Sequence, residues 1–344
     1  MNAQLLTAGP QFDPSAIYRR RDGIYATDLL IAGLVGLDFF SWLARKSADA
    51  ATICRELGLA ARPADVMLTY FAAAGFIEET GGIFQLTPAA REHLVKGSPW
   101  FIGPYYASLK DRPVCLDLLK VLRTGKPANW GSSEREKEWT KAMETDEFAR
   151  GFTAAMDCRG AFLGRALAQA VECGQHRRLL DIGGGSGIYA CALVANHPHL
   201  TAAVYEKPPV DRIAGQLISE RGFARQVSVV GGDMFGAPLP AGFDLHLYSN
   251  VLHDWDVPVV KDLLARSFAA LEPGGMLVIH DMHLNAQKNG PLPVAEYSVI
   301  LMHSTEGRIY SVAELEAWLH AAGFADVQYR TTVADRSVVT ARKA

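Results

Sequence analysis

The sequence has no strong charge imbalance and few cysteines. Its 344 residues carry a formal net charge of −3, so electrostatics give no reason to expect nucleic acid or an anionic membrane as a partner. The cysteines form no C-x-x-C pair, and their scatter suits reduced thiols better than a disulfide framework or a zinc site. They are Cys54, Cys115, Cys158, Cys173 and Cys191.

Long apolar runs and a signal peptide are lacking as well. No apolar run approaches the ~20 residues that span a bilayer. The first residues, MNAQLLTAGPQFDPS, do not have the charged-then-apolar order of a secretory signal. We therefore expect a cytoplasmic protein, long enough for one large or two ordinary domains with their own cores.

Residues 1–100 predict helices followed by a short hairpin around Gly81 and Gly82. This is the order of a winged helix, a module that often binds DNA. A helix that enters a major groove needs contacts with phosphates and bases, but the expected recognition helix, PADVMLTYFAAAG, carries no basic residue. Its apolar surface instead suggests burial against another subunit.

The rest of the chain changes its pattern at about His176. Residues 101–175 are mainly helical in pattern and contain a polar loop, KPANWGSSERE, that is typical of a domain boundary. Residues 176–344 alternate strands with helices, which predicts a doubly wound, mostly parallel sheet of α/β class. The expected strands contain RRLLDIG, AAVYE, QVSVVGG, DLHLYSN and GMLVIHD.

A glycine-rich loop follows the first of these strands, in LLDIGGGSG. The relaxed dinucleotide pattern G-x-G-x-x-G/A matches at Gly185, Gly187 and Ala190, which leaves a nicotinamide or flavin cofactor open. Asp181, at the strand end, could take up a cationic amino group, and Glu206, at the end of the next strand, could hold two ribose hydroxyls. These features indicate an adenosine-containing cofactor.

The order of the later motifs narrows this choice. VLRTGKPANW, LLDIGGGSG, GDMFGAPLP, LHDWD, LEPGGMLVIHD and EGRIYSVAELEAWLHAAGF follow one another along the chain. In this the chain resembles the class I S-adenosylmethionine-dependent O-methyltransferases of plant phenolic and bacterial polyketide pathways. The resemblance covers nearly the whole length. It implies a winged-helix dimerisation domain, a homodimer, a Rossmann-like domain that binds S-adenosyl-L-methionine, and a role in secondary metabolism.

The resemblance also implies which residues bind the cofactor. Asp181 and the backbone around Gly183 and Gly185 would hold its methionine tail, and Glu206 would take the ribose hydroxyls. The family more often shows Asp followed by Leu-Pro at this last position, whereas this chain has Glu-Lys-Pro.

On the adenine side, Asp233 would bind the exocyclic amino group, with Met234 and Phe235 packing on the ring. Ser249 stands where plant members carry a lysine near the cofactor.

His253 would be the general base. A neutral phenol is a poor nucleophile with a pKa near 10, so a base within hydrogen-bond reach speeds methyl transfer by taking its proton as attack proceeds. The family orients this histidine with two acids. Asp281 fits the first, but the second falls on Gly307, with Glu306 one residue early. Either Asp281 or Glu306 acts alone, or the activity has drifted from methyl transfer.

Other assignments stay open at the level of sequence. Phe152, Met156, Trp255 and Met302 could line an acceptor pocket or pack the core. The histidines and acids of HDWD and HDMH are close in sequence. Successive residues of a strand point to opposite faces, so His253 and Asp254 could not both face one ion, and we expect no metal site.

The function expected from the sequence is therefore methyl transfer to a hydroxyl of a small aromatic or polyketide-like metabolite. Two alternatives remain. One is a cofactor-binding relative with non-methyl chemistry, such as hydroxylation or decarboxylation. The other is a winged-helix transcriptional regulator with a ligand-sensing domain.

Overall fold

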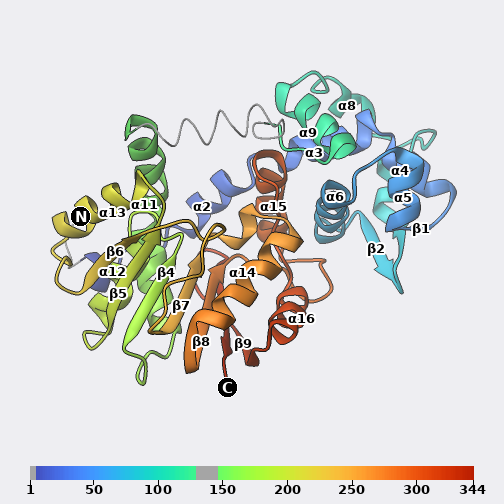
Figure 1. The fold of residues 1–344 in the computed structure, drawn as a ribbon. Helices are drawn as coiled ribbons and strands as arrows, with labels where there is room; N and C mark the ends of the chain where they lie inside the picture. Colours follow the sequence, from blue (N-terminus) through green and yellow to red (C-terminus); the bar gives the residue numbers. More distant parts are fainter. Residues whose placement is uncertain (1–4, 129–145) are drawn as a thin grey trace. The chain divides into compact units, whose positions relative to one another are not determined.

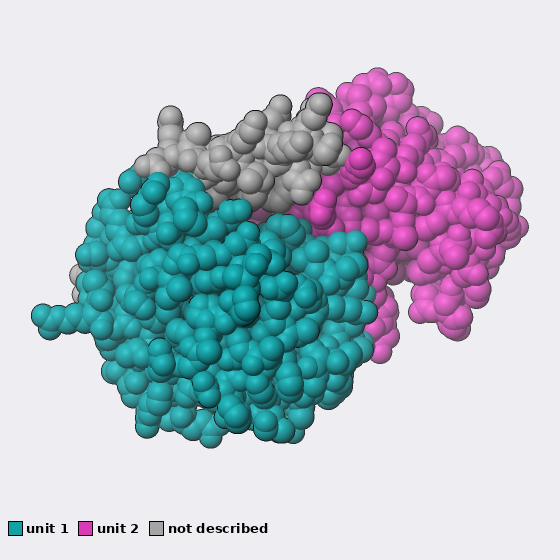
Figure 2. All heavy atoms as spheres, in the orientation of Figure 1, with its two compact units in different colours: residues 1–16, 137–283, 312–344 teal, residues 17–136, 284–311 magenta. Residues whose placement is uncertain are grey.

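The structure is a computed structural model that describes residues 5–128 and 146–344, without the side chains of residues 146–148 and of Phe152. The chain divides into two compact units, each built from separate stretches of sequence (Figure 2). The first unit comprises residues 1–16, 137–283 and 312–344, and the second comprises residues 17–136 and 284–311.

The first unit is built on a seven-stranded sheet in the described residues, with strand order β6-β5-β4-β7-β8-β10-β9 (Figure 1). The neighbours from β6 to β8 pair in parallel, and β10 is antiparallel to both β8 and β9. The strands are β4 (Arg178–Ile182), β5 (Thr201–Glu206), β6 (Val227–Gly231), β7 (Phe243–Ser249), β8 (Leu271–Asp281), β9 (Ala325–Thr331) and β10 (Ser337–Arg342). The expected α/β class with a mostly parallel sheet is confirmed.

Helices cover both faces of this sheet because the chain winds in two directions from its middle. From β4 it crosses toward β6, and from β7 it crosses toward β8, and right-handed crossovers in opposite directions place their helices on opposite faces. Helix α11 packs on α12 and α13, and α14 packs on α16. These helices are α11 (Asp146–Ala170), α12 (Ile188–Asn196), α13 (Val210–Glu220), α14 (Val257–Ala270) and α16 (Val312–Ala322), with the short α1 (Leu5–Ala8) against α11 and α12.

The second unit is mainly helical and contains a small three-stranded sheet of order β1-β3-β2. Helices α5 and α6 are followed by the hairpin β2–β3, as the sequence predicted. The bounds are α2 (Ser15–Asp22), α3 (Ala26–Ile31), η1 (Ala32–Gly36), α4 (Phe39–Arg45), β1 (Ala48–Asp49), α5 (Ala50–Leu57), α6 (Ala61–Ala73), β2 (Ile77–Thr80), β3 (Ile83–Leu86), α7 (Pro88–His93), α8 (Gly103–Ala107), α9 (Pro113–Thr124) and α15 (Leu292–Ser304).

Aromatic side chains form the core of the second unit. The ring of Phe71 lies 5.0 Å from that of Phe40 and 5.5 Å from that of Phe39, and Phe76 packs on the same cluster. Helix α15 comes from much later in the chain but packs on α6, α3 and α9. Helix α6, whose apolar surface we expected to be buried against another subunit, is therefore contacted by a later segment of the same chain.

The two units do not follow the sequence boundaries. We expected successive domains at 1–100, 101–175 and 176–344, whereas both units are discontinuous. That division into domains, the winged-helix classification and the dimerisation role stay predictions. Across the described residues no single helix is long and apolar enough to cross a membrane. The bent pair Ser15–Gly36 and Phe39–Arg45 has the length and apolar composition of a membrane span only when its two helices are taken together.

Candidate active site

The expected functional side chains of the first unit gather at one edge of its sheet. Strands β4, β5, β7 and β8 run parallel, so their carboxyl ends meet at the same edge. Open α/β sheets bind ligands at this edge. Glu206 and Asp281 are the last residues of β5 and β8, and the glycine loop and His253 lie in the segments that follow β4 and β7.

The glycine loop leaves β4 by a path that needs glycine. Gly183, Gly185 and Gly187 have φ angles of 68°, 55° and 73°, in the left-handed region that side chains disfavour. A Cβ on Gly184 would lie 2.6 Å from the carboxyl carbon of Asp181. The loop backbone therefore passes directly over the Asp181 carboxyl group, where no side chain fits.

Asp181 is a buried acid without a counter-charge. Its side chain is fully buried, and among the described residues neither carboxylate oxygen accepts a hydrogen bond of good geometry, although the backbone N–H of Ala190 lies close enough to lower its pKa slightly. Burial, reinforced by the nearby charge of Glu206, raises the pKa of Asp181 to about 7. A buried carboxylate is costly unless it is paired, so this position fits the ammonium group of a ligand.

Glu206, on the neighbouring strand β5, binds the backbone of the glycine loop. Its Oε2 accepts a hydrogen bond of 3.1 Å from the backbone N–H of Gly185, and its Oε1 accepts one of 3.1 Å from the backbone N–H of Lys207. Burial raises its pKa. Each carboxylate oxygen can accept more than one hydrogen bond, so Glu206 retains capacity for ligand hydroxyls.

The residues expected beside adenine lie after β6. Asp233 is exposed, and its Oδ1 accepts a hydrogen bond of 2.9 Å from the backbone N–H of Phe235. The Phe235 ring meets that of Trp255 edge-on, with centroids 4.6 Å apart. The sulfur of Met234 lies 3.9 Å from the position of a Cβ on Gly183, so this segment adjoins the glycine loop.

His253 and Asp281 form a buried pair. Nδ1 of His253 lies 2.7 Å from Oδ1 of Asp281, and both side chains are about 5% exposed. The same Oδ1 accepts a hydrogen bond from the backbone N–H of Met282. Burial alone would raise the pKa of Asp281, but the neighbouring His253 outweighs it and holds this pKa below its usual value.

The local structure around His253 differs from our expectation. His253 and Asp254 lie in the 3-10 turn η2 (Leu252–Asp254) and not on a strand, so the argument from alternating strand faces was wrong. Nε2 of His253 lies 3.7 Å from Oδ1 of Asp254. Asn250, two residues before η2, has a φ of 55°, a left-handed conformation that asparagine tolerates better than most residues.

A polar network beneath the site was missed by the sequence analysis. The Oγ of Ser249 shares a hydrogen bond of 2.8 Å with Nδ1 of His280 and accepts one of 3.1 Å from Nδ2 of Asn250. Nδ2 of Asn250 also reaches the hydroxyl of Tyr189 at 3.2 Å. Ser249 is thus engaged inside the protein, and its role toward the cofactor stays a prediction. No sequence motif marks this network, because its members lie on three separate elements.

The comparisons with known proteins agree with this geometry. A family model described as the O-methyltransferase domain matches residues 117–325. The chain is 32% identical to a 3-hydroxy-5-methyl-1-naphthoate 3-O-methyltransferase of Streptomyces sahachiroi, over 92% of this chain and 90% of that one. It is also 32% identical to the tetracenomycin polyketide synthesis 8-O-methyl transferase TcmO of Streptomyces glaucescens, over 93% of both chains.

The chain belongs to the O-methyltransferase family. A solved structure of an O-methyltransferase family 2 protein from Planctomyces limnophilus, in complex with apigenin, matches it with a TM-score of 0.89 and 31% identity, covering 100% of this chain and 99% of that one. This membership confirms the expected enzyme class, an O-methyltransferase that depends on S-adenosyl-L-methionine.

The geometry around His253 does not test four other expected site residues of this O-methyltransferase. Met156 is half-buried on α11, and the side chain of Phe152 lies outside the described structure. Met302 and Glu306 belong to the second unit, where Met302 is buried and Glu306 is exposed. Their roles stay predictions.

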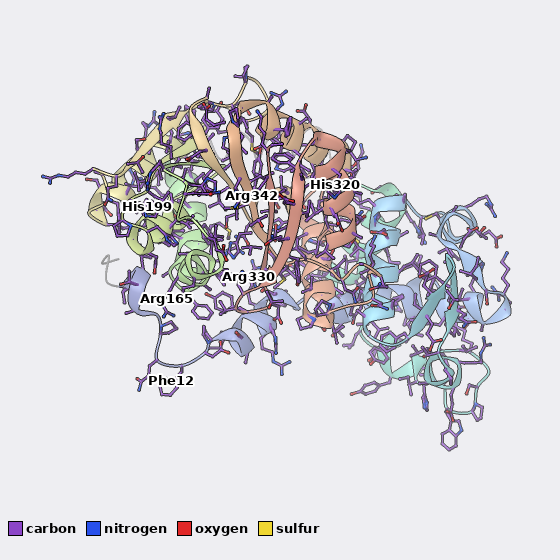
Figure 3. The ribbon with its side chains drawn as sticks, turned by 90° about the horizontal axis from the view of Figure 1, so that it is seen from below. Phe12, Arg165, His199, His320, Arg330 and Arg342 are labelled. Atoms are coloured by element: carbon purple, nitrogen blue, oxygen red, sulfur yellow. The ribbon has the colours of Figure 1, made fainter. Side chains whose placement is uncertain are left out.

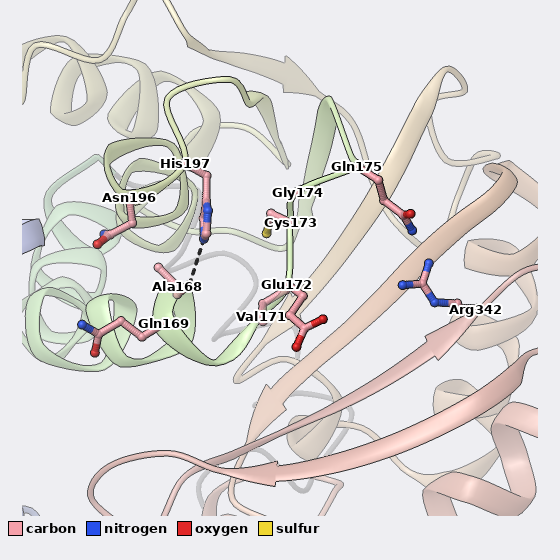
Figure 4. Close-up of a pocket in the computed structure, with 10 residues that line it drawn as sticks. All are labelled: Ala168, Gln169, Val171, Glu172, Cys173, Gly174, Gln175, Asn196, His197 and Arg342. Carbon is pink, nitrogen blue, oxygen red and sulfur yellow. Dashed lines mark hydrogen bonds between the residues drawn. The ribbon is translucent and has the colours of Figure 1, made fainter.

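The O-methyltransferase has a surface pocket of about 660 Å³ at the other edge of the sheet (Figure 4). It lies between the carboxyl ends of α11 and α12 and the end of β10, where Arg342 contributes (Figures 3 and 4). Nε2 of His197 is bound to the carbonyl oxygen of Ala168 at 2.8 Å. The His197 ring is therefore used to bind a carbonyl group near the carboxyl end of α11. The expected catalytic residues lie at the opposite edge of the sheet, so the active site is assigned to that edge and not to this pocket.

The unpaired Asp181 predicts how the stability of the ligand-free enzyme depends on pH. Its folded-state pKa of about 7 lies above the unfolded value near 3.8, so its contribution to the free energy of unfolding falls as pH rises between these values. We expect the stability of Asp181→Asn relative to the wild type to increase as pH rises from about 4 to about 7 and to stay constant above that, measured by urea unfolding.

A difference in unfolding free energy between Asp181→Asn and the wild type that does not change with pH would contradict this account.

Proposed function

We propose that this enzyme transfers a methyl group to a hydroxyl of a small aromatic or polyketide-like metabolite, with His253 as the general base. The buried pair of His253 and Asp281 is the observation that carries the proposal. The names of the two Streptomyces relatives, one acting on a naphthoate and one in polyketide synthesis, support this acceptor class.

The cofactor fits the residues at the sheet edge. When bound, S-adenosyl-L-methionine supplies a methyl group on a cationic sulfur. Asp181, unpaired and buried beneath the glycine loop, would pair with its ammonium group, and Glu206 would accept the ribose hydroxyls. Asp233 has one carboxylate oxygen held by Phe235 and can turn the other toward the adenine amino group.

In this proposal His253 accepts the proton, and Asp281 orients the imidazole and stabilises its charged form. Asp281 accepts the hydrogen bond from Nδ1–H, which fixes the tautomer so that Nε2 carries the lone pair. Nε2 would take the proton of the acceptor hydroxyl, so that the oxygen becomes nucleophilic enough to receive the methyl group that the bound cofactor would supply. Asp281 stays ionised because its pKa is lowered, and it stabilises the imidazolium that forms.

The pair can be tested by transfer of labelled methyl groups to a panel of phenols, hydroxynaphthoates and flavones. His253→Ala should lower the rate by about 10²–10⁴, the usual contribution of a general base, while S-adenosylhomocysteine still binds. Asp281→Asn should also lower the rate, because the amide can present a donor and so favour the other imidazole tautomer.

The exposed His320 of α16, labelled in Figure 3, offers a matched control. His320→Ala should keep the wild-type rate. Undiminished transfer by His253→Ala would overturn the proposed base, and failure of the wild type to bind S-adenosylhomocysteine in calorimetry would overturn the proposed use of the site.

The second unit supports the proposal of a homodimer. An exposed apolar segment runs from residue 100 to residue 116, where Trp100 is 63% exposed and Tyr105 is 79% exposed. Its other exposed members are Ile102, Leu109 and Leu116. A monomer rarely leaves such a patch open, so a second copy of this chain is its proposed occupant.

The location of the enzyme belongs to the same proposal. All five cysteines are free in the structure, as suits the reducing cytoplasm. The structure of α6 argues against the alternative of a transcriptional regulator. The guanidinium of Arg62 on this helix donates hydrogen bonds of 2.9 Å to the carbonyl oxygens of Gly125 and Gly307, so this basic side chain is used within its own unit.

The dimer predicts a change in sedimentation. The wild type should sediment as a dimer, and Trp100→Glu with Tyr105→Glu should shift it to the monomer, because charges in an apolar interface are costly to desolvate. Ile83→Glu changes an exposed apolar residue of β3 outside the segment and should leave the dimer intact. A monomeric wild type, or a double variant that stays dimeric, would contradict the proposal.

A further inference from the structure

Three side chains outside the expected site fasten the glycine loop to the helices beside it. The hydroxyl of Ser186, within the loop, donates a hydrogen bond to Oδ1 of Asp157 on α11. Nη2 of Arg221, at the end of α13, donates to the same oxygen, and Nη1 donates to the carbonyl oxygen of Ser186 at 2.9 Å. We call Asp157, Ser186 and Arg221 the loop clamp; its helices lie together in Figure 1.

The loop clamp is a buried ion pair. The Arg221 side chain is 3% exposed and that of Asp157 is 14% exposed. Cys191 lies beside the guanidinium but gives it no counter-charge, because burial raises the pKa of this thiol to about 12. Asp157 therefore supplies the negative charge. The free energy needed to desolvate a buried ion pair is about as large as the free energy gained from the attraction between its charges. A contribution to folding stability alone therefore does not explain why the enzyme has this pair.

The loop clamp holds the part of the glycine loop that has the most backbone freedom. Ser186 stands between Gly185, whose N–H binds Glu206, and Gly187, whose φ is 73°. Glycines have the most backbone freedom to lose, so a loop rich in them is expensive to order when a ligand binds. Holding Ser186 at both its hydroxyl and its carbonyl orders the loop before the ligand arrives, which improves binding.

We propose that Asp157, Ser186 and Arg221 are positioning residues that hold the glycine loop in its ligand-binding form and thereby set the affinity for the cofactor. The inference rests on the proposed function, in which this loop binds S-adenosyl-L-methionine. It assigns a role to Asp157 of α11, which lies far in sequence from the loop and carries no recognisable motif. The loop clamp affects binding and leaves the proton transfer at His253 unchanged.

The test measures the dissociation constant of S-adenosylhomocysteine by calorimetry. Ser186→Ala removes the hydroxyl but keeps the ion pair, and Asp157→Asn removes the charge but keeps an acceptor. We expect each to weaken binding about tenfold, the usual effect of losing one hydrogen bond to a charged group. The double variant should bind no more weakly than about the worse single variant, because both changes break one contact.

Arg150→Ala is the matched control. Its guanidinium donates a hydrogen bond of 2.9 Å to Gln216, so it also joins α11 to α13, but at an exposed position away from the loop. We expect its dissociation constant to equal that of the wild type. Hydrogen exchange of residues 183–190 in the ligand-free enzyme should be faster in the loop clamp variants and unchanged in Arg150→Ala.

The outcomes separate this inference from the proposed function. A wild type that does not bind S-adenosylhomocysteine overturns the proposed function, and the inference with it. A wild type that binds, with Ser186→Ala binding equally well, overturns the loop clamp alone, even if the variant melts at a lower temperature. If Asp157→Asn does not fold, Ser186→Ala decides, because it leaves the ion pair in place. At saturating S-adenosyl-L-methionine the Ser186→Ala variant should reach the wild-type kcat with a raised KM.

Discussion

The passage of the chain over the Asp181 carboxyl group is the constraint on which the functional edge of the sheet depends. A side chain at Gly184 would collide with that carboxyl, and the next turns need glycines at positive φ. The same close approach buries Asp181 fully, and no cationic side chain pairs with it in the described part of the chain. The cost of an unpaired acid is thus built into the free protein, and a cationic ligand would recover it. Glu206 and the loop clamp matter because they keep the backbone on this path.

The environments of four buried histidines distinguish a chemical role from a structural one. His246, His280 and His283 each bind a serine hydroxyl through Nδ1, at 2.7 to 2.8 Å. Burial lowers their pKa values to about 3, 3 and 4, so they stay neutral and serve the core. His253 has a carboxylate in that position. A carboxylate stabilises the imidazolium, which a serine hydroxyl does much less, so His253 is equipped to gain a proton.

The sequence could predict what depends on local pattern and strand direction. Alternation of strands and helices indicated the parallel sheet, and parallel strands must end together, so Asp181, Glu206, His253 and Asp281 could be expected at one edge. Contacts between distant segments carry no such pattern. The stretch 284–311 joins the second unit through α15, which no periodicity reveals. The loop clamp joins Asp157 to Arg221, and the η2 turn follows one left-handed residue, Asn250.

The segment around Gly307 supports our proposal that Asp281 orients His253. The resemblance described above implies a second acid at position 307, where this chain has a glycine whose carbonyl oxygen accepts from Arg62 and whose N–H donates to the hydroxyl of Thr305. The segment is thus held by backbone hydrogen bonds within its own unit, and the neighbouring Glu306 is exposed to solvent, where charge interactions are weak. Asp281 is buried, and a hydrogen bond between charged groups is stronger where water is excluded. We therefore propose that this single buried carboxylate, 2.7 Å from the ring nitrogen, orients the imidazole without a second acid.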